Sequence, residues 1–215
     1  MTDLEHLRTR AAEFSCASIV AAYPDHNFVD AACALLDRDI DAAVSLDDRR
    51  STYLRLFENG EGRCSLHETE YGRMRALAKG HDLADINGFY QAFDMNLVDG
   101  DGAEMADHLA VELEFYTLLL FKEAALRNSG DHEGVEIVVD ARKKFLEDHL
   151  GRLGLGLASR VPRIDNDTYA SLVQSCCALI ASECAVLQAK PAPLDFYESE
   201  ETNKPMECGG LPVLN

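Results

Sequence analysis

One short stretch of the chain sets acids and an imidazole on an otherwise apolar segment, Asp107-His108-Leu109-Ala110-Val111-Glu112-Leu113-Glu114-Phe115. If it is helical, its apolar residues form one buried stripe, and His108 and Glu112 lie on the adjacent stripe. Carboxylates beside an apolar surface suit a cationic, partly hydrophobic partner, because guanidinium groups pair with carboxylates. The simpler alternative is that these charges form the solvated side of an amphipathic helix.

Thiols and an imidazole form a second candidate site. Zinc and iron–sulfur centres use thiolates, often together with histidine. The chain offers Cys64, His67 and Cys208, although their spacing does not require that they meet. Cys176 and Cys177 are adjacent, and adjacent residues on a helix point about 100° apart, so they do not readily share one ion. A metal- or redox-responsive helical protein that uses Cys64, His67 and Cys208 is therefore the alternative function.

Catalytic motifs are absent from the sequence. A carboxylate-bridged di-iron bundle needs paired Glu-x-x-His motifs, and the chain has none. The glycine-rich segment from Gly151 to Gly156 lacks the Lys-Ser/Thr ending of a phosphate-binding loop. Cys208 stands beside two glycines without an obvious base to activate it. We therefore expect no enzyme activity, no cofactor and no resident metal.

The composition restricts the partners. The 215 residues carry a formal net charge of -18, which disfavours nucleic acid and anionic membrane surfaces and favours basic peptides. The chain begins Met-Thr-Asp-Leu-Glu-His, without the basic and apolar regions of a signal peptide. We find no apolar window of about 20 residues. These features predict a cytoplasmic protein without stable membrane association, and its seven cysteines then read as reduced thiols.

Apolar residues recur at the helical period along most of the chain, and no run alternates at period two. The pattern predicts an all-α, single-domain helical bundle over residues 1–190 and an irregular, acidic tail over residues 191–215. We expect Ser65 and Glu68 to form a capping box that opens a helix ending at Gly80. We also expect Gly151 to Gly156 to break a helix, and Asp167 to cap the last one.

Several motifs then occur in an order that resembles the TorD/DmsD/NarJ family of cytoplasmic chaperones for molybdenum oxidoreductases. They are Tyr53-x-x-Leu56-Phe57, Glu68-x-Glu70-Tyr71, Phe89-Tyr90-x-x-Phe93, Asp107-His108-Leu109-x-x-Glu112-Leu113-Glu114-Phe115 and Phe145-x-x-x-His149-Leu150. The resemblance implies a TorD-like helical bundle that binds an apo-molybdoenzyme catalytic subunit, either at its twin-arginine leader or at another segment. It also implies that two copies can form a homodimer by exchanging helices.

The resemblance assigns partner binding first to the acidic stretch. Asp107 and His108 match the family's Asp-His pair, and Glu112 and Glu114 match the acids that follow it. The chain departs from the family pattern at Ala106, where a proline is common, and it contains no tryptophan. Glu112 and Glu114 lie about 200° apart on a helix, so at least one of them should have a structural partner.

Two further groups complete the expected site. Glu70 and Tyr71 match the acidic-aromatic end of the family's earlier motif. Phe89, Tyr90 and Phe93 form an aromatic patch that could line a groove for the apolar part of a leader peptide. The alternative for these aromatic residues is an ordinary place in the core.

Overall fold

The computed structural model describes residues 3–58, 64–71, 75–97, 105–192 and 194, and these residues form helices and no β-strand. The all-α prediction is therefore confirmed. The helices are α1 (Asp3–Ala21), α2 (Phe28–Leu36), α3 (Leu46–Tyr53), α4 (Arg75–Ala92), α5 (Leu109–Ser129), α6 (His132–Asp148), α7 (Leu150–Ala158) and α8 (Asp167–Leu187). A π-helical turn, Leu54–Glu58, continues α3, and short 3-10 turns lie at Glu68–Glu70 and Val161–Arg163.

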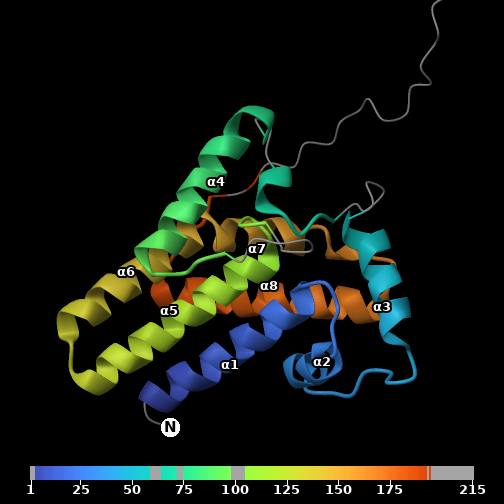
Figure 1. The fold of residues 1–215 in the computed structure, drawn as a ribbon, viewed down its shortest axis with the longest axis horizontal. Coiled ribbons are helices and arrows are strands. Elements are labelled where there is room, and N and C mark those ends of the chain that lie inside the picture. The colour runs from blue at the N-terminus through green and yellow to red at the C-terminus, as the bar shows by residue number, and fades with distance from the viewer. Residues whose placement is uncertain (1–2, 59–63, 72–74, 98–104, 193, 195–215) are drawn as a thin grey trace, which may run out of the picture.

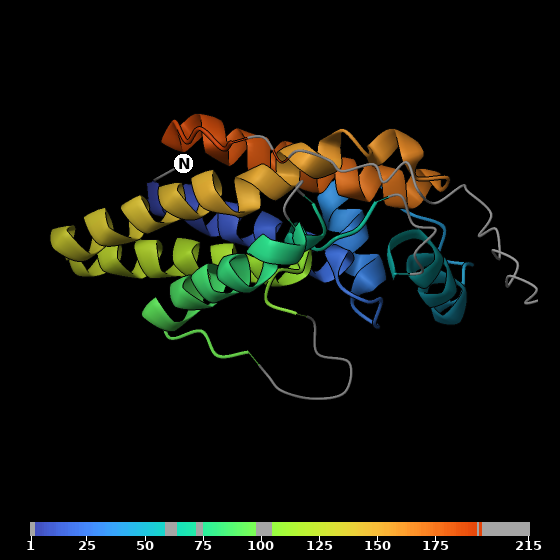
Figure 2. The same cartoon turned by 90° about the horizontal axis from the view of Figure 1, so that it is seen from above.

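Helix α5 is the centre of the bundle. It packs along α1 and α6, while α8 packs against α7 and α1 (Figure 1). Seen from above, α4 lies on the opposite side of α5 from α8 (Figure 2). The expected apolar stripe of α5 is buried throughout, at Leu109, Leu113, Tyr116 and Leu120. Because α5 is covered on several sides, acids that follow this stripe are also drawn into the interior.

The turn between α5 and α6 follows the sequence closely. Gly130 ends α5 with a φ of 76°, a left-handed conformation that glycine adopts without strain. The Asp131 side chain then accepts a hydrogen bond from the Gly134 N–H and caps α6. At the start of α8 the cap is Asn166, whose side chain accepts from the Tyr169 N–H, so the expectation for Asp167 is wrong by one residue.

The expected glycine helix breaks are also wrong. Gly80 lies within α4, and Gly151 to Gly156 lie within α7. In α7 the glycines permit close packing, since a Cβ on Gly151 would lie 2.2 Å from the Leu146 carbonyl oxygen and one on Gly154 would lie 2.9 Å from Ile180. The helical break comes one residue before α7, at His149, with φ -134° and ψ -94°.

The expected capping box does not form. Ser65 accepts a hydrogen bond from the His67 N–H, and Glu68 to Glu70 form a 3-10 turn instead of opening a long helix. The Glu68 side chain does not reach back to Ser65, because it forms a hydrogen bond with His149, which is distant in the sequence. A local capping pattern was thus overridden by a tertiary contact.

Helix α8 is apolar enough, by length and composition, to cross a membrane, with a mean hydropathy of 1.6 over an 18-residue window. This corrects the expectation that the chain contains no such window. The buried side of α8 joins the core through Leu172, Val173, Cys176 and Ile180. Core packing therefore accounts for much of its apolar character.

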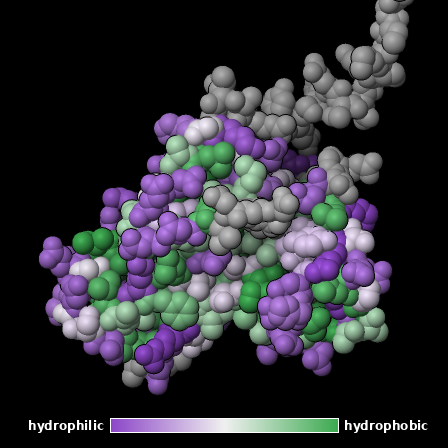
Figure 3. All heavy atoms as spheres, in the orientation of Figure 1, coloured by the Kyte–Doolittle hydropathy of each residue, from purple (hydrophilic) through white to green (hydrophobic). Residues whose placement is uncertain are grey.

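Hydrophilic and hydrophobic residues are interspersed over the face of the molecule drawn in Figure 3. Nearly all of the expected tail lies outside the described residues. The division at residue 190 and the exchange of helices between two copies stay predictions.

Candidate partner-binding site

The acidic stretch begins at a junction between two distant segments. Residues 64–71, which we call the strap, run antiparallel to the residues that lead into α5, with His67 opposite His108. The Glu68 N–H donates to the Asp107 carbonyl at 2.9 Å, and the Leu109 N–H donates to the Leu66 carbonyl at 2.8 Å. The strap therefore covers the Asp-His pair by backbone pairing, as well as through its side chains.

Asp107 is fully buried beneath the strap. One carboxylate oxygen lies 3.3 Å from His67 Nδ1, and the other accepts hydrogen bonds from the Thr69 hydroxyl and, at 3.2 Å, from the Thr69 N–H. Burial alone would raise the pKa of Asp107, but the hydrogen bonds from His67 and Thr69 lower it to about 2. Asp107 is therefore a buried carboxylate that remains ionised at neutral pH.

His108 is also fully buried, and it fastens the start of α5. Burial and the neighbouring His67 lower the pKa of His108 to about 3, against the opposing effect of Asp107, so its ring is neutral. Its Nδ1 accepts from the Ala110 N–H at 3.2 Å, which places the proton on Nε2. That nitrogen lies 3.1 Å from the Tyr53 hydroxyl, which in turn donates to the Ala21 carbonyl at 3.0 Å.

Glu112 lies one helical turn further along α5 and is also fully buried. Neither of its carboxyl oxygens has a hydrogen-bond partner among the described residues. Burial, followed by the like charges of Glu68 and Asp107, raises the pKa of Glu112, and the positive charge of Arg152 opposes this only in part. Buried polar atoms are nearly always paired, so this carboxyl group is an exception that calls for an explanation.

His149 contacts both the strap and α4. Its Nδ1 lies 3.0 Å from Glu68 of the strap, and its Nε2 lies 3.1 Å from Asp85 of α4. Burial alone would lower the pKa of His149, but the two carboxylates raise it. Thr69, Arg152 and this histidine were not in the expected site, although the motif Phe145-x-x-x-His149 could have pointed to the last of them.

The acidic stretch therefore does not line the expected open groove. Asp107, His108 and Glu112 lie inside the protein, because the strap and the neighbouring helices cover them. Glu114 points the other way on α5 and is exposed, as the helical geometry required for one of the two acids. Whether these residues contact a partner stays a prediction.

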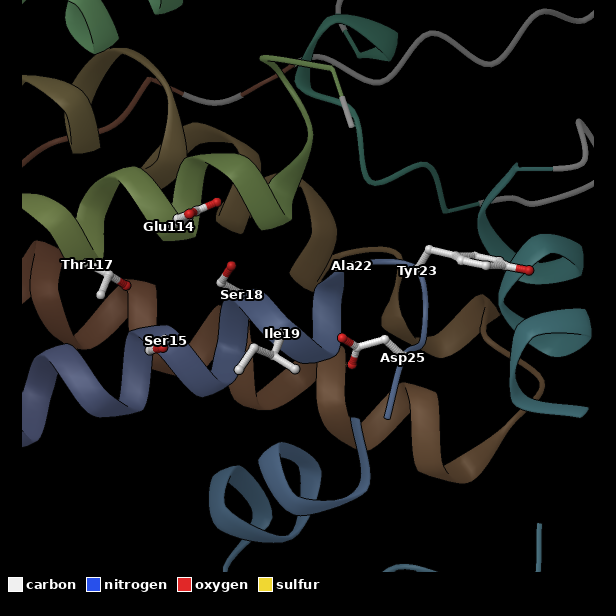
Figure 4. Close-up of a pocket in the computed structure, with 8 residues that line it drawn as sticks. All are labelled: Ser15, Ser18, Ile19, Ala22, Tyr23, Asp25, Glu114 and Thr117. Carbon is white, nitrogen blue, oxygen red and sulfur yellow. The ribbon is translucent and has the colours of Figure 1, made fainter. Parts of the chain in front are cut away.

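Glu114 lines an open pocket of about 270 Å³ between α1 and α5. Figure 4 shows the carboxylates of Glu114 and Asp25 directed toward the same space, while the Tyr23 ring extends toward α3. The guanidinium of Arg50 lies over that ring, 5.4 Å from its centre. The remaining lining residues are Ser15, Ser18, Ile19, Ala22 and Thr117. The pocket is open, mostly polar and acidic, which suits a cationic side chain.

The other expected residues fall into two places. Glu70 and Tyr71 end the strap, where Glu70 lies 3.4 Å from Lys79 and the Tyr71 hydroxyl donates to the Ser65 carbonyl. The aromatic patch packs into the interior. Ring centres are separated by 5.3 Å between Phe89 and Phe145, by 4.8 Å between Tyr90 and Phe115, and by 6.0 Å between Phe93 and Phe115. Tyr90 is buried and the two phenylalanines are half-buried, so the patch contributes to the core.

The alternative metal site receives little support from the described residues. Burial raises the pKa of Cys64 to about 11, which disfavours a thiolate, and Cys208 lies outside the described residues. Glu58, His67 and His108 do bring ligand atoms within 4.8 Å of one another. However, the Ala110 N–H occupies the Nδ1 lone pair of His108 and fixes the proton on Nε2. A metal bound at either nitrogen would have to break this arrangement.

The chain is an all-helical bundle in which a buried Asp-His pair stands at the start of the central helix α5. The model of the nitrate reductase delta subunit family matches residues 25–152, and the chain belongs to this family of redox enzyme maturation proteins. It is 33% identical over 153 residues to the chlorate reductase assembly chaperone protein of Ideonella dechloratans, covering 69% of this chain and 75% of the relative. It is 32% identical over 142 residues to the selenate reductase assembly chaperone protein of Thauera selenatis, covering 65% and 70%. Members of this family are assembly chaperones and not catalysts.

Proposed function

We propose that this protein is a cytoplasmic chaperone for an apo-molybdenum oxidoreductase. It binds the twin-arginine leader, or another arginine-bearing segment, of the catalytic subunit and holds it until the molybdenum cofactor is inserted, before export. The observation that carries the proposal is the likeness to two reductase assembly chaperones over about two thirds of the chain.

The charge distribution supports a cationic client. The net charge of -18 attracts a basic segment at long range and speeds its encounter with the chaperone. Glu114 and Asp25 then offer two carboxylates at one open pocket. Arginine suits such a site because its planar guanidinium donates several hydrogen bonds to carboxylates. Each exposed pair contributes about 0–1 kcal/mol, so apolar contacts must supply most of the affinity.

Calorimetry with a synthetic twin-arginine leader peptide tests the proposal. We expect saturable binding that weakens as salt is raised and weakens further when both arginines are replaced by glutamine. Glu114→Gln should weaken binding, whereas Glu136→Gln, which changes another exposed acid, on α6, should not.

The matching cellular test is co-purification of the chaperone with a molybdenum oxidoreductase catalytic subunit, before and after the cofactor is supplied. We expect the cofactor-free form to be retained and the loaded form to be released. Absence of binding both to leader peptides and to any apo-oxidoreductase would remove the proposal.

A further inference from the structure

Asp107 is buried, so an arginine of a partner can reach its carboxylate only if the strap moves away. The strap lies over Asp107 and presents His67 to it, with Nδ1 3.3 Å from the carboxylate. Thr69 supplies two further donors to the same carboxylate. The strap thus gives Asp107 several N–H and O–H donors, which is also what a guanidinium offers.

The backbone of the strap forms hydrogen bonds that the backbone of a bound peptide could also form. Its pairing with the residues before α5 consists of the Glu68 N–H to Asp107 carbonyl bond and the Leu109 N–H to Leu66 carbonyl bond. Neither bond depends on a side chain, so any extended peptide can make the same pair. Proteins often bind peptides in this way, by adding a strand to an exposed backbone edge.

The strap does not supply hydrogen-bond donors to every buried acid near it, and Glu112 is the exception. Both of its oxygens lack a hydrogen-bond partner among the described residues, and its side chain is fully buried. The Nε of Arg152 is likewise buried without a partner there. Three acids converge here, namely Glu68, Asp107 and Glu112. A second guanidinium would supply donors that the strap lacks.

We infer that the strap occupies the place that an arginine-bearing extended segment of the partner takes, and that partner binding displaces it from Asp107 and Glu112. This inference rests on the proposed function. It places the two arginines of a leader at Asp107 and Glu112, which leaves the pocket at Glu114 for a further basic residue of the same segment. One guanidinium replaces His67 and Thr69 at Asp107, and the other reaches Glu112. The partner backbone takes over the hydrogen bonds of Leu66 and Glu68.

Competition between strap and partner has a distinctive consequence. If the strap must leave before the peptide binds, the apparent affinity equals the intrinsic affinity multiplied by the fraction of molecules in which the strap is open. Weakening the strap increases this fraction and therefore raises the apparent affinity. A merely structural strap predicts the opposite, because loosening it would disorder the site. The sign of the effect therefore separates the two roles.

The test uses Thr69→Val, which removes the hydroxyl that donates to Asp107 and keeps the shape of the side chain. We expect the twin-arginine peptide to bind about fivefold or more tightly to this variant than to wild type. The matched control is Ser129→Ala, which removes a hydroxyl bond within α5, to the Leu126 carbonyl, at the opposite end of the helix from the strap. It should leave the affinity unchanged. Thermal unfolding of both variants verifies that they are folded.

Hydrogen exchange of the wild-type complex supplies the second readout. Peptide binding should speed hydrogen exchange at the Glu68 and Thr69 amides, which lose their acceptors on Asp107. The Leu109 amide should stay protected, because a carbonyl of the peptide replaces the Leu66 carbonyl as its acceptor. The inference stands only if both results hold. If wild type binds the peptide but Thr69→Val binds no more tightly, or if the strap amides stay protected, the inference is wrong and the proposed function survives. If no variant binds any peptide, both fail.

Discussion

Two buried polar clusters lie along α5, and they differ in charge balance. Near the end of the helix, Glu123 belongs to a network with Arg142, Glu183 and Arg10, which we call the arginine network. Near its start, Glu112 and Asp107 belong with Glu68 to the acidic junction under the strap. The acids of both clusters are buried, so the main contrast between the clusters is in charge pairing.

In the arginine network each acid meets a guanidinium. Arg142 donates to Glu123 and to Glu183, Arg10 lies 2.6 Å from Glu183, and the Tyr116 hydroxyl donates to Glu183 at 2.7 Å. Burial alone would raise the pKa of Glu183, but these partners lower it. A network with balanced charges and satisfied hydrogen bonds has no need of a ligand, and we assign it a structural role in joining α1, α5, α6 and α8.

At the acidic junction the pairing is incomplete, although Glu68 contacts His149 and lies 3.8 Å from the guanidinium of Arg152. Asp107 is satisfied by the strap, yet the oxygens of Glu112 have no partner among the described residues. An excess of buried acid lowers stability and leaves hydrogen-bonding capacity unused. Both clusters are therefore buried, but among the described residues only the acidic junction contains a carboxyl group without a hydrogen-bond partner. The predictions below test that distinction.

The largest effect should come from Arg142→Met in the arginine network. Removal of this guanidinium leaves Glu123 and Glu183 buried with fewer partners, and we expect the free energy of unfolding to fall by about 3–5 kcal/mol. The control is Lys144→Met, on the same helix, where Lys144 pairs with Asp140 at the surface. Urea unfolding should show a change of less than about 0.5 kcal/mol for the control. Equal effects of the two changes would contradict the structural role.

The next effect depends on pH and arises at His108. Its folded pKa is about 3, below the ordinary value of 6.5. Between these values the unfolded chain binds a proton that the folded state does not bind. The stabilising contribution of neutral His108 is therefore complete above pH 6.5 and is lost as the pH falls.

His108→Gln removes this dependence. The stability advantage of wild type over the variant should shrink by about 1.4 kcal/mol per pH unit below pH 6.5, or by about 2 kcal/mol at pH 5. Comparison with the variant is necessary because the raised pKa of Glu112 acts in the opposite direction. Denaturant titrations from pH 7 to pH 5 measure the difference, and a constant difference would show that the pKa of His108 is not lowered in the folded state.

Glu112→Gln should produce a smaller effect of opposite sign. Because the folded pKa of Glu112 is raised, wild type loses stability as the pH rises above the ordinary value of 4.5. The variant does not carry this cost and should be about 1–2 kcal/mol more stable than wild type at pH 7, with little difference near pH 4.5. Loss of stability in the variant at pH 7 would indicate that the carboxylate has a structural partner.

The smallest effect should come from Glu114→Gln at the open pocket. This exposed change should alter the free energy of unfolding by less than about 0.5 kcal/mol. Peptide affinity should fall by up to about fivefold at low salt, and the difference should vanish at high salt. Calorimetry at two ionic strengths measures both. A salt-independent loss would place Glu114 in a desolvated contact instead of an open one.

Much of the fold could be predicted from the sequence, because helical periodicity and helix caps are local. The stripe of α5 and the turn at Gly130 follow directly from residue spacing. The expected breaks at Gly80 and Gly151 were wrong for a physical reason. A glycine can end a helix or allow close packing within it, and only the neighbouring helix decides which role applies.

The site was predicted less completely. The sequence identified the acids on α5, and helical geometry showed that Glu112 and Glu114 must face apart. It did not identify the strap, because the pairing of His67 with His108 joins residues that are far apart in the chain. Nor could it show that His149 would hold the Glu68 side chain, although both residues belong to motifs that the sequence displays.

The amino-acid sequence by itself determined the helical class, the acidic surface, the family resemblance and the residues that open α5. These properties depend on composition and on neighbours within a few residues. The tertiary structure alone decided which acids are buried, which are balanced by arginine and which are covered by the strap. Burial and charge pairing depend on distances between segments remote in the chain, and those distances exist only once the helices have packed.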